Sequence, residues 1–394
     1  MIYIISNTPY PNGWASTNRI KCYAKALSIE DVACKQLVFR PTEVKGKDRG
    51  NYKQGVDEGV PYLHIGPLYK PNISLIRKFY DVWSLICLYW YLLIHLKKDD
   101  TAFFYHEPFA FLKLFVRLVH FKKAKYMVEL CEYPNCAIDI ETEKTIAKGQ
   151  RIINEYFPLY DGVIAISEEL LNLAKTHVNN KCKLIKIPIL VEFDKKKAKD
   201  LSDKTPEKFI FHSGSITQKK DGFLGMLEAF AQALPDLNTR LNFVSTGDYT
   251  KSIIKEDIDR ILDKYGIRDR VRFTGYLSDK DLIANLQKAT LVIINKYRTK
   301  QNKYCFSTKL SEYLTAGKPV IITNYGEAMN WLEDRKNAYI VEPEDAKQLA
   351  DAIVEAINNP QERMKIAHNG LELCKKSFDY KQYSDTLKKF FCNK

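Results

Sequence analysis

A chain of 394 residues is about twice the usual length of one domain, and 45% hydrophobic with 28% charged residues is a globular composition, which excludes a disordered or fibrous protein. Nine cysteines without a CxxC pair, and an N-terminus without the order of a signal peptide, exclude a disulfide scaffold and predict a cytoplasmic protein. The net charge of +13 does not form a recognisable nucleic-acid-binding module, so no nucleic-acid partner is expected.

The first half of the chain alternates strand-like and helix-like segments. "MIYIIS" predicts a strand, the loop "NTPYPNGWAS" follows, and a helical pattern runs over residues 17–27. Further strands are predicted at "VACKQLVF", "TAFFYH", "KYMVEL", "DGVIAIS" and "CKLIKI", with helices after Ile73, from Phe109, from about Glu143 and from Glu168. Apolar runs of this length between helices are typical of a parallel sheet covered on both faces.

The most apolar run covers residues 82–94, "VWSLICLYWYLLI", and its 13 residues are fewer than the ~20 that cross a bilayer. The stretch "FAFLKLFVRLVHFKK" follows, with Lys113 and Arg117 among phenylalanine, leucine and valine. A basic, aromatic surface can lie on an anionic membrane, and the alternative is a helix buried in a large core. Both interpretations stay open, with peripheral contact at the inner face of the cell membrane as the functional one.

The pattern breaks at residues 188–208, "PILVEFDKKKAKDLSDKTPEK", which are charged, bounded by proline and without periodicity, and these predict an interdomain linker. A second alternating series follows, with strands at "KFIFHSG", "RLNFVSTG", "RVRFTG", "ATLVII", "KPVIIT" and "NAYIV" and helices over 222–233, 252–265, 279–288 and 346–358. The terminal "DYKQYSDTLKKFF" predicts one more amphipathic helix. The predicted fold class is therefore α/β, with two doubly wound Rossmann-like units.

Two loops of the second half have the residue types of an anion site. In "FHSGSITQKKDG", Gly214 lets the backbone approach an anion, and Lys219 and Lys220 supply charge. In "FSTKLSEYLTAGKPVI", Thr308 is the predicted N-cap of a helix, and no capping box uses Glu312. A phosphate on the first helical amides brings a ribose diol within reach of Glu312. A charged surface turn and an acid that favours the helix dipole are the alternatives.

Taken in order, these motifs resemble the donor-binding domain of the retaining glycosyltransferases of family 4, which have the GT-B fold. The matching stretches are "HSGSITQKKDGFLGMLEAF", "NFVSTGDY", "VRFTGYLSDKDLIANLQKATLVII", "STKLSEYLTAGKPVIITNYGEAMNWL" and "NAYIVEPEDAKQLADAI". In the first half the similarity rests on "PYPNGWASTNR", "DGVIAISEEL" and "IPILVEFD". The resemblance implies an acceptor-binding domain over 1–190, a nucleotide-sugar-binding domain over 191–375 facing it across a central cleft, and a helix over 376–394 that packs back on the first domain.

The resemblance also implies an activity. A sugar would move from a nucleotide-diphosphate sugar to an acceptor hydroxyl with retention of configuration, as in a hexosyltransferase of surface polysaccharide or lipid-linked oligosaccharide biosynthesis. No metal or other cofactor is expected, and the partners would be the donor and a glycan or lipid-linked glycan acceptor. A non-catalytic sugar-nucleotide-binding partner subunit and a GT-B-like sugar-nucleotide epimerase are the alternatives.

Site residues carry over position by position. The resemblance implies that Lys220 contacts the leaving diphosphate and that Glu312 binds the ribose hydroxyls. It also implies that the backbone amides around Lys309 bind a phosphate. The predicted donor site is Gly13, Gly214, Ser215, Lys219, Gly275, Tyr276, Thr308, Lys309, Leu310 and Glu312, and the catalytic candidates are Lys220 with the strand-end residues His106 and Glu132. Structural roles are the alternative for His106 and Glu132, and Arg19 is expected to face the acceptor or to be structural.

Two positions depart from the family. Ser215 stands where many members have a phosphate-binding arginine, and Tyr304 stands where the first glutamate of a pair is expected. Lys219, or Lys296 and Arg298 of the loop "NKYRTKQNK", would supply the missing positive charge, and the sequence does not choose between them.

Overall fold

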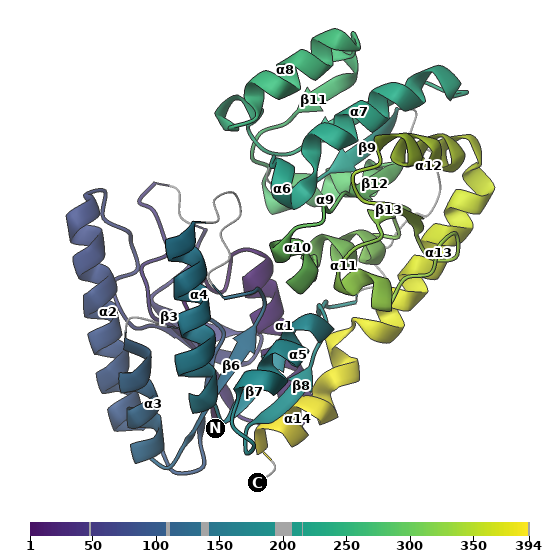
Figure 1. Cartoon of the computed structure of the whole chain (residues 1–394). Coiled ribbons are helices and arrows are strands. Elements are labelled where there is room, and N and C mark those ends of the chain that lie inside the picture. Colours follow the sequence, from purple (N-terminus) through teal and green to yellow (C-terminus); the bar gives the residue numbers. More distant parts are fainter. Residues whose placement is uncertain (47–48, 108–110, 135–141, 194–206, 215, 393–394) are drawn as a thin grey trace. The chain divides into compact units, whose positions relative to one another are not determined.

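The structure is a computed structural model that describes residues 1–46, 49–107, 111–134, 142–193, 207–214 and 216–392. These residues divide into two compact units (Figure 1). Within the described residues, unit 1 falls in 1–192 and 379–392, and unit 2 contains residues 193, 207–214 and 216–378. Most of the predicted interdomain linker, residues 194–206, lies outside the described residues.

Unit 1 is built on an eight-stranded sheet in the order β3-β4-β2-β1-β5-β6-β7-β8. The strands are β1 (Ile2–Ser6), β2 (Cys34–Val38), β3 (Gln54–Asp57), β4 (Val60–His64), β5 (Thr101–Phe104), β6 (Lys125–Leu130), β7 (Gly162–Ala165) and β8 (Lys183–Lys186). Every neighbouring pair is parallel except β3 and β4, which form an antiparallel hairpin. The prediction of a wholly parallel sheet is wrong at this edge, because half-exposed "QGVD" lacks an apolar run.

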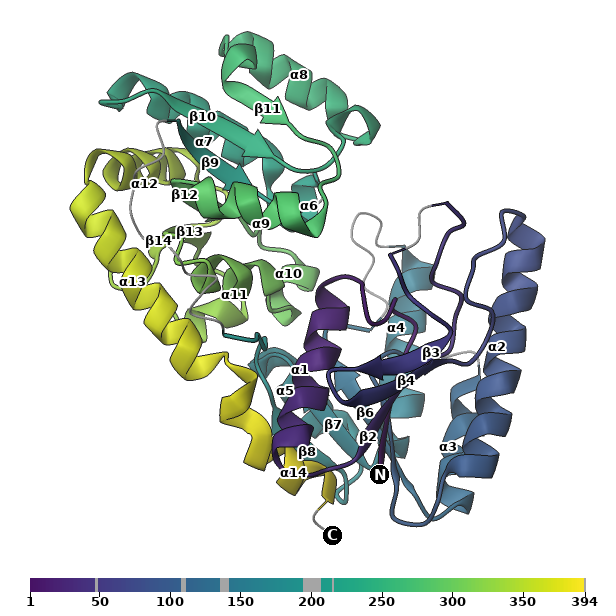
Figure 2. The ribbon, with the colours of Figure 1, turned by 180° about the vertical axis from the view of Figure 1, so that it is seen from behind.

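The helices of unit 1 are α1 (Ala15–Ile29), α2 (Ser74–His95), α3 (Leu112–Phe121), α4 (Glu143–Tyr156), α5 (Glu168–His177) and α14 (Ser384–Cys392). The predicted start of α5 is confirmed, because the Ser167 hydroxyl accepts a hydrogen bond from the Leu170 amide. The expected return of the C-terminal helix is confirmed as well. Helix α14 packs on α1 (Figure 2), and Phe391 lies edge-on to Phe103 of the sheet with ring centroids 5.1 Å apart.

Unit 2 has a six-stranded, wholly parallel sheet in the order β11-β10-β9-β12-β13-β14. The strands are β9 (Lys208–His212), β10 (Leu241–Ser245), β11 (Val271–Phe273), β12 (Leu291–Ile294), β13 (Val320–Thr323) and β14 (Tyr339–Val341). Continuous apolar runs make up its central strands, and Ile210, Phe243, Leu291 and Ile321 are fully buried. The strand predictions in this half are confirmed.

The helices of unit 2 are α6 (Gln218–Asp221), α7 (Phe223–Ala233), α8 (Lys255–Lys264), α9 (Asp279–Lys288), α10 (Lys300–Tyr304), α11 (Thr308–Thr315), α12 (Ala346–Asn358) and α13 (Pro360–Ser377). The helix predicted over residues 222–233 is confirmed as α7, and the sequence prediction missed the short α6 before it, which ends where Gly222 takes a left-handed conformation with φ of 54°. The sequence prediction missed α13. It buries Arg363, Gly370 and Cys374 beside its apolar residues, so its hydrophobic pattern is weak.

Candidate functional site

In unit 2 the chain runs from β9 outward to β10 and β11, then returns to the other side of β9 as β12. Open parallel sheets bind ligands beyond the carboxyl ends of their strands, at the point where the strand order reverses. The segments after β9 and β12 therefore define the candidate site of this unit. Gly214, Lys219 and Lys220 of the prediction follow β9, and Lys296 follows β12.

An ion-pair cluster occupies this position. One carboxylate oxygen of Asp221, Oδ1, lies 2.9 Å from Nζ of Lys296 and 2.9 Å from Nζ of Lys309. The side chain of Asp221 is 6% exposed, that of Lys296 7% and that of Lys309 18%. Burial alone raises the pKa of the Asp221 carboxyl, but the two ammonium groups outweigh it and hold the pKa well below its ordinary value. With both lysines charged, the cluster carries a net charge of +1.

His212, the last residue of β9, borders this cluster. Its Nε2 lies 3.4 Å from Nζ of Lys309, and its Nδ1 lies 3.1 Å from the Ser245 hydroxyl. Because that hydroxyl donates to the Thr246 carbonyl, it accepts from Nδ1–H, which leaves Nε2 to accept from Lys309. Burial, followed by the charge of Lys309, lowers the pKa of His212 to about 3, so the ring is neutral at physiological pH. Burial also lowers the pKa of Lys309.

Gly214 makes room for the Lys309 side chain. The residue has φ of 140°, and a Cβ placed on it would lie 2.6 Å from Nζ of Lys309. Its amide donates to the Thr246 hydroxyl at 2.8 Å, which fixes the loop against the end of β10. The glycine that the sequence marks as an anion loop therefore has a second role, since it lets a lysine from α11 reach Asp221.

The carbonyl end of α6 is held from two sides. The Asn302 side-chain amide donates to the carbonyls of Lys219 and Lys220 at 3.2 Å and 3.1 Å, and Nζ of Lys296 donates to the Lys220 carbonyl at 3.1 Å. The Lys219 side chain is exposed and that of Lys220 is half-buried. The structure thus positions the backbone that carries both predicted lysines.

Helix α11 differs from the prediction at its start. Ser307, with an extended backbone, is the N-cap, and Thr308 is already helical, so the predicted N-cap at Thr308 is wrong by one residue. The Leu310 amide donates to the Ser307 carbonyl at 3.1 Å, which leaves the first-turn amides of Thr308 and Lys309 without an intrahelical acceptor. Glu312 lies in the second turn and is half-buried.

The remaining predicted donor residues of unit 2 lie at the ends of neighbouring strands. Gly275, with φ of 69°, follows β11, and its carbonyl accepts from the Gly247 amide at 3.1 Å. The adjacent Tyr276 side chain is 82% exposed, so its ring is available to a ligand. Ser215 lies outside the described residues. Arg298 is engaged elsewhere, since it pairs with Glu342 at 2.8 Å.

The candidates of unit 1 also gather at a reversal of strand order. The chain runs from β1 to β2 on one side and later returns as β5 on the other. Gly13 follows β1, His106 follows β5, and Glu132, which is exposed, follows β6 next to β5. A Cβ on Gly13 would lie 2.1 Å from the Thr17 hydroxyl oxygen, so only glycine fits this turn whether or not a ligand is near.

His106 lies in an apolar setting. Burial, with a smaller effect of Arg40, lowers its pKa to about 4, and its Nδ1 is buried without a hydrogen-bond partner among the described residues. The neighbouring Glu107 accepts a hydrogen bond from the Tyr160 hydroxyl at 2.9 Å, and burial raises the pKa of this carboxyl to about 8. At neutral pH the strand end therefore presents a neutral imidazole beside a protonated acid.

Arg19 is structural. Its side chain is 3% exposed and donates to Glu129 at 2.5 Å, to the Tyr23 hydroxyl at 2.7 Å and to the Ile187 carbonyl at 3.0 Å. These bonds join α1 to β6 and to the segment after β8. Of the two roles expected from the sequence, the structural one is confirmed.

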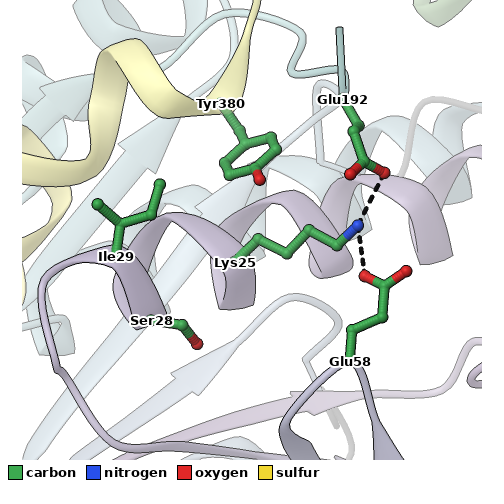
Figure 3. Close-up of a pocket in the computed structure, with 6 residues that line it drawn as sticks. All are labelled: Lys25, Ser28, Ile29, Glu58, Glu192 and Tyr380. Atoms are coloured by element: carbon green, nitrogen blue, oxygen red, sulfur yellow. Dashed lines mark hydrogen bonds and ion pairs between the residues drawn. The ribbon is translucent and has the colours of Figure 1, made fainter. Parts of the chain in front are cut away.

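A polar pocket of about 430 Å³ lies beside the last turns of α1 in unit 1 (Figure 3). There Lys25 points between the carboxylates of Glu192 and Glu58, and it bonds Glu192 at 2.7 Å. The last turns of a helix that follows β1 return toward the amino ends of the parallel strands. The pocket therefore lies at the edge of the sheet opposite to Gly13 and His106, and its lysine is neutralised.

The sequence prediction missed His212 and Asp221. Both stand in the quoted stretch "FHSGSITQKKDG", and the strand-end argument that selected His106 applies equally to His212. Asp221 gave no separate signal, because an acid after two lysines is typical of a solvated turn. Its lysine partners Lys296 and Lys309 are 75 and 88 residues away along the chain.

Within the described ranges, no three or more histidine, cysteine, aspartate or glutamate side chains converge as ligands for a metal ion. None of the helices in the described part of the chain combines the length and apolar character needed to cross a bilayer.

Known proteins resemble this chain in sequence and in fold. Residues 193–373 match the family described as Glycosyl transferases group 1. Lipopolysaccharide core biosynthesis glycosyltransferase LpsD of Rhizobium meliloti is 28% identical over 174 residues, 44% of this chain and 46% of that protein, so the match spans less than half of the relative's length. Sucrose-phosphate synthase of Thermosynechococcus elongatus has a TM-score of 0.73 at 15% identity over 99% of this chain and 98% of that one. Anabaena HepE in complex with UDP-glucose has a TM-score of 0.67 at 14% identity over 99% and 98%.

Two doubly wound units, with a terminal helix that returns to the first, define a GT-B protein, and the similarity to solved GT-B structures confirms this fold. Residues 193–373, which make up most of unit 2, are similar to the glycosyl transferases group 1 family. The family resemblance found in the sequence is confirmed.

Proposed function

We propose that the chain is a glycosyltransferase that moves a sugar from a nucleotide-diphosphate sugar to an acceptor hydroxyl, with retention of configuration and without a metal ion. The observation that carries this proposal is the charge cluster of Asp221, Lys296 and Lys309 at the strand-order reversal of unit 2. A buried net positive charge beside the start of α11 suits a diphosphate. The complex of Anabaena HepE with UDP-glucose supports a nucleotide-sugar donor.

The proposed chemistry follows from where charge develops. Breaking the anomeric C–O bond leaves negative charge on the diphosphate, so groups aimed at it stabilise the transition state more than the ground state. Lys220, the positive cluster and the first-turn amides of α11 are those groups. Glu312 would hold the ribose hydroxyls, and Tyr276 would lie near the base. Fixed positive groups of this kind replace the metal ion that would otherwise neutralise the leaving group.

On the acceptor side we propose His106 and Glu132, with Gly13 near the donor diphosphate. A neutral His106 can accept or donate one hydrogen bond to a sugar hydroxyl, and its lowered pKa keeps it in that state. The pathway we propose is surface polysaccharide or lipid-linked oligosaccharide biosynthesis, which the name of the relative LpsD supports. A cytoplasmic location fits a soluble nucleotide sugar.

A donor screen by thermal shift is the first test. UDP, GDP, ADP and CMP sugars are added to the full chain, and a ligand at 100 times its Kd adds ~2.7 kcal/mol to stability. For a unit of this size that is a shift of ~5–11 °C. A chain that none of these compounds stabilises does not bind a nucleotide sugar, and the proposal is then wrong.

Substitution tests the assigned roles. Lys220→Ala and Glu312→Ala should each abolish turnover while Tm changes little, because both side chains lie at the rim of the strand ends rather than in the core. Lys251→Ala, an exposed lysine of the same unit, is the control and should keep full activity. Full activity in either site variant removes that residue from the site.

Two measurements separate the alternatives. An epimerase releases no nucleotide on addition of an acceptor, whereas a transferase does, and the anomeric proton coupling of the product reports retention. A non-catalytic subunit binds the donor in calorimetry but shows no turnover, whichever acceptor is added. Unchanged turnover in excess chelator is expected if no metal takes part.

A further inference from the structure

Helix α2 exposes an apolar face on unit 1. Of its 22 residues, only Ser84, Leu85, Leu88 and Leu92 are buried. On the opposite side a stripe of large apolar side chains recurs every three or four residues and is 45–76% exposed: Leu75, Phe79, Trp83, Ile86, Trp90 and Ile94. A helix that faces water on this side would carry polar residues there, so the stripe needs a partner.

The neighbouring helix α3 extends this face. Helices α2 and α3 pack against each other (Figure 1), and Phe111, Leu114 and Phe121 are 40–77% exposed. An apolar groove of about 140 Å³ runs between the two helices, with Val82 and Ile86 on one wall and Phe111 and Leu114 on the other. We call the stripe, the groove and the exposed apolar residues of α3 the α2–α3 surface.

Charge around the α2–α3 surface is mostly positive. Residues 71–98 and 111–125 contain nine lysines and arginines and one acid, Asp81. Asp81 lies 3.9 Å from Arg40, so even this acid faces a cation. Arg77 and Lys78 are exposed at the start of α2, and Arg117 is exposed on α3. Lys113, one turn before Arg117, is exposed as well but pairs with Glu155 of α4 at 2.9 Å.

This charge decides between possible partners. A second copy packed on the same surface would bring like charges together, which opposes association. An anionic lipid surface complements both features, since it accepts apolar side chains below its headgroups and attracts the lysines and arginines.

We propose that the α2–α3 surface lies on an anionic lipid membrane, with α2 parallel to the membrane plane. The stripe enters the boundary between headgroups and acyl chains, and Arg77, Lys78 and Arg117 contact lipid phosphates. The protein is then held at the bilayer surface, which neither helix has the character to cross. This inference goes beyond glycosyl transfer and does not depend on it.

The test measures sedimentation of the full chain with vesicles, in the absence of any sugar nucleotide. Phosphatidylcholine vesicles with about 30 mol % phosphatidylglycerol should bind the chain, and pure phosphatidylcholine should bind it at least tenfold less. The emission of Trp83 and Trp90 should shift to the blue on binding. The triple variant Leu75→Ser, Phe79→Ser, Ile94→Ser should lower the partition coefficient about 100-fold.

A matched control separates this surface from general stickiness. Tyr52, Val56 and Ile253 are 72%, 69% and 82% exposed, close to the 76%, 64% and 70% of Leu75, Phe79 and Ile94. Changing all three control residues to serine should leave vesicle binding unchanged.

Charge reversal gives a second, independent variant. The double variant Lys78→Glu, Arg117→Glu should weaken binding about 25-fold or more, because the loss of each basic residue costs roughly a factor of five. The remaining binding should depend less on salt. All variants change exposed side chains, and an unchanged Tm verifies folding.

Three results would overturn the proposal. Equal loss of binding in the triple variant and in its control shows that the α2–α3 surface is not specific. Failure to bind anionic vesicles shows that lipid is not its partner. A dimer in lipid-free solution that the triple variant converts to monomer shows that a second copy covers the surface instead. Because the assay contains no donor or acceptor, failure to bind vesicles does not contradict the proposed activity. Failure to find the activity likewise does not contradict membrane binding.

Discussion

Replacing Asp221 by asparagine keeps the size of the side chain and removes its charge. In the native chain the carboxylate pairs with two ammonium groups at 2.9 Å each, Nζ of Lys296 and Nζ of Lys309. In Asp221→Asn, Lys296 after β12 and Lys309 of α11 both lose their counter-charge. They also lie near His212, which is already neutral and therefore cannot reduce the positive charge by losing a proton.

Two estimates bound the destabilisation. Removing one partner of a buried ion pair costs about 3–5 kcal/mol, because it leaves an uncompensated charge. A lysine can escape this by losing its proton, and for an ordinary pKa of about 10.4 that costs about 4.6 kcal/mol at pH 7. We therefore expect Asp221→Asn to lower the stability of unit 2 by about 3–5 kcal/mol, which corresponds to about 6–20 °C in Tm for a unit of this size.

The chain provides its own reporter for this measurement. Of four tryptophans only Trp331 lies in unit 2, so replacing Trp14, Trp83 and Trp90 by phenylalanine makes the fluorescence report unfolding of that unit. Asp257→Asn is the control, because Asp257 pairs with Arg260 on the surface of α8, with side chains 45% and 73% exposed. Such a pair contributes ~0–1 kcal/mol.

The stabilisation by Asp221 should depend on pH. The folded pKa of Asp221 lies below its unfolded value, so the stabilisation is present above the unfolded pKa and is lost as pH falls through the folded one. The difference between the native chain and Asp221→Asn should be constant near neutral pH and shrink only below about pH 4. If Asp221→Asn melts within 2 °C of Asp257→Asn, the charge cluster does not stabilise unit 2 and our account of it is wrong.

Two further predictions concern other buried ionisable groups. Because the folded pKa of His212 is about 3 and the unfolded value is about 6.5, acid favours the unfolded state, and this residue should lower the stability of unit 2 by about 2 kcal/mol between pH 7 and pH 5. The Trp331 signal in urea should show this slope in the native chain and lack it in His212→Gln, and equal slopes would refute it. In unit 1, Arg19→Met should destabilise by about 3–5 kcal/mol by leaving Glu129 unpaired, and Arg19→Met with Glu129→Met should recover much of that in thermal unfolding; a double variant no more stable than the single one would contradict the pairing argument.

Much of the fold could be predicted because its strands are continuous apolar runs. The strands in "KFIFHSG" and "ATLVII" lie almost wholly buried in a parallel sheet, and short, mainly apolar runs are typical of such strands. The elements that escaped prediction lack this signal. β3 alternates exposed and half-buried residues, and α13 packs through Gly370, where a Cβ would lie 2.7 Å from the Leu314 side chain. Close packing of a small residue leaves no trace in hydrophobic periodicity.

The location of the candidate site could be predicted from the sequence, but the ion pairs within it could not. Gly214 and Lys220 could be placed at a strand end from local pattern alone, because a glycine-rich loop between a strand and a helix occurs at one edge of a parallel sheet. Which charge neutralises Asp221 depends on side chains far apart along the sequence that meet only in the folded unit. Local sequence also could not show that Lys309, expected to matter through its amide, acts through its side chain as well.

The ion pairs of Asp221 also bear on Ser215, which stands where many family members have a phosphate-binding arginine. Of the charges that the sequence offered as replacements, Arg298 is paired with Glu342, and Lys296 with Asp221. Neither is therefore a simple substitute for a single phosphate-binding arginine. The positive charge at the strand ends belongs to the cluster, in which Lys296 and Lys309 share one carboxylate and leave a net charge of one next to the first turn of α11. A diphosphate at this position would meet a buried, preorganised positive charge that is held in place by Asp221 and by the Lys220 carbonyl, rather than a mobile side chain that must be ordered on binding.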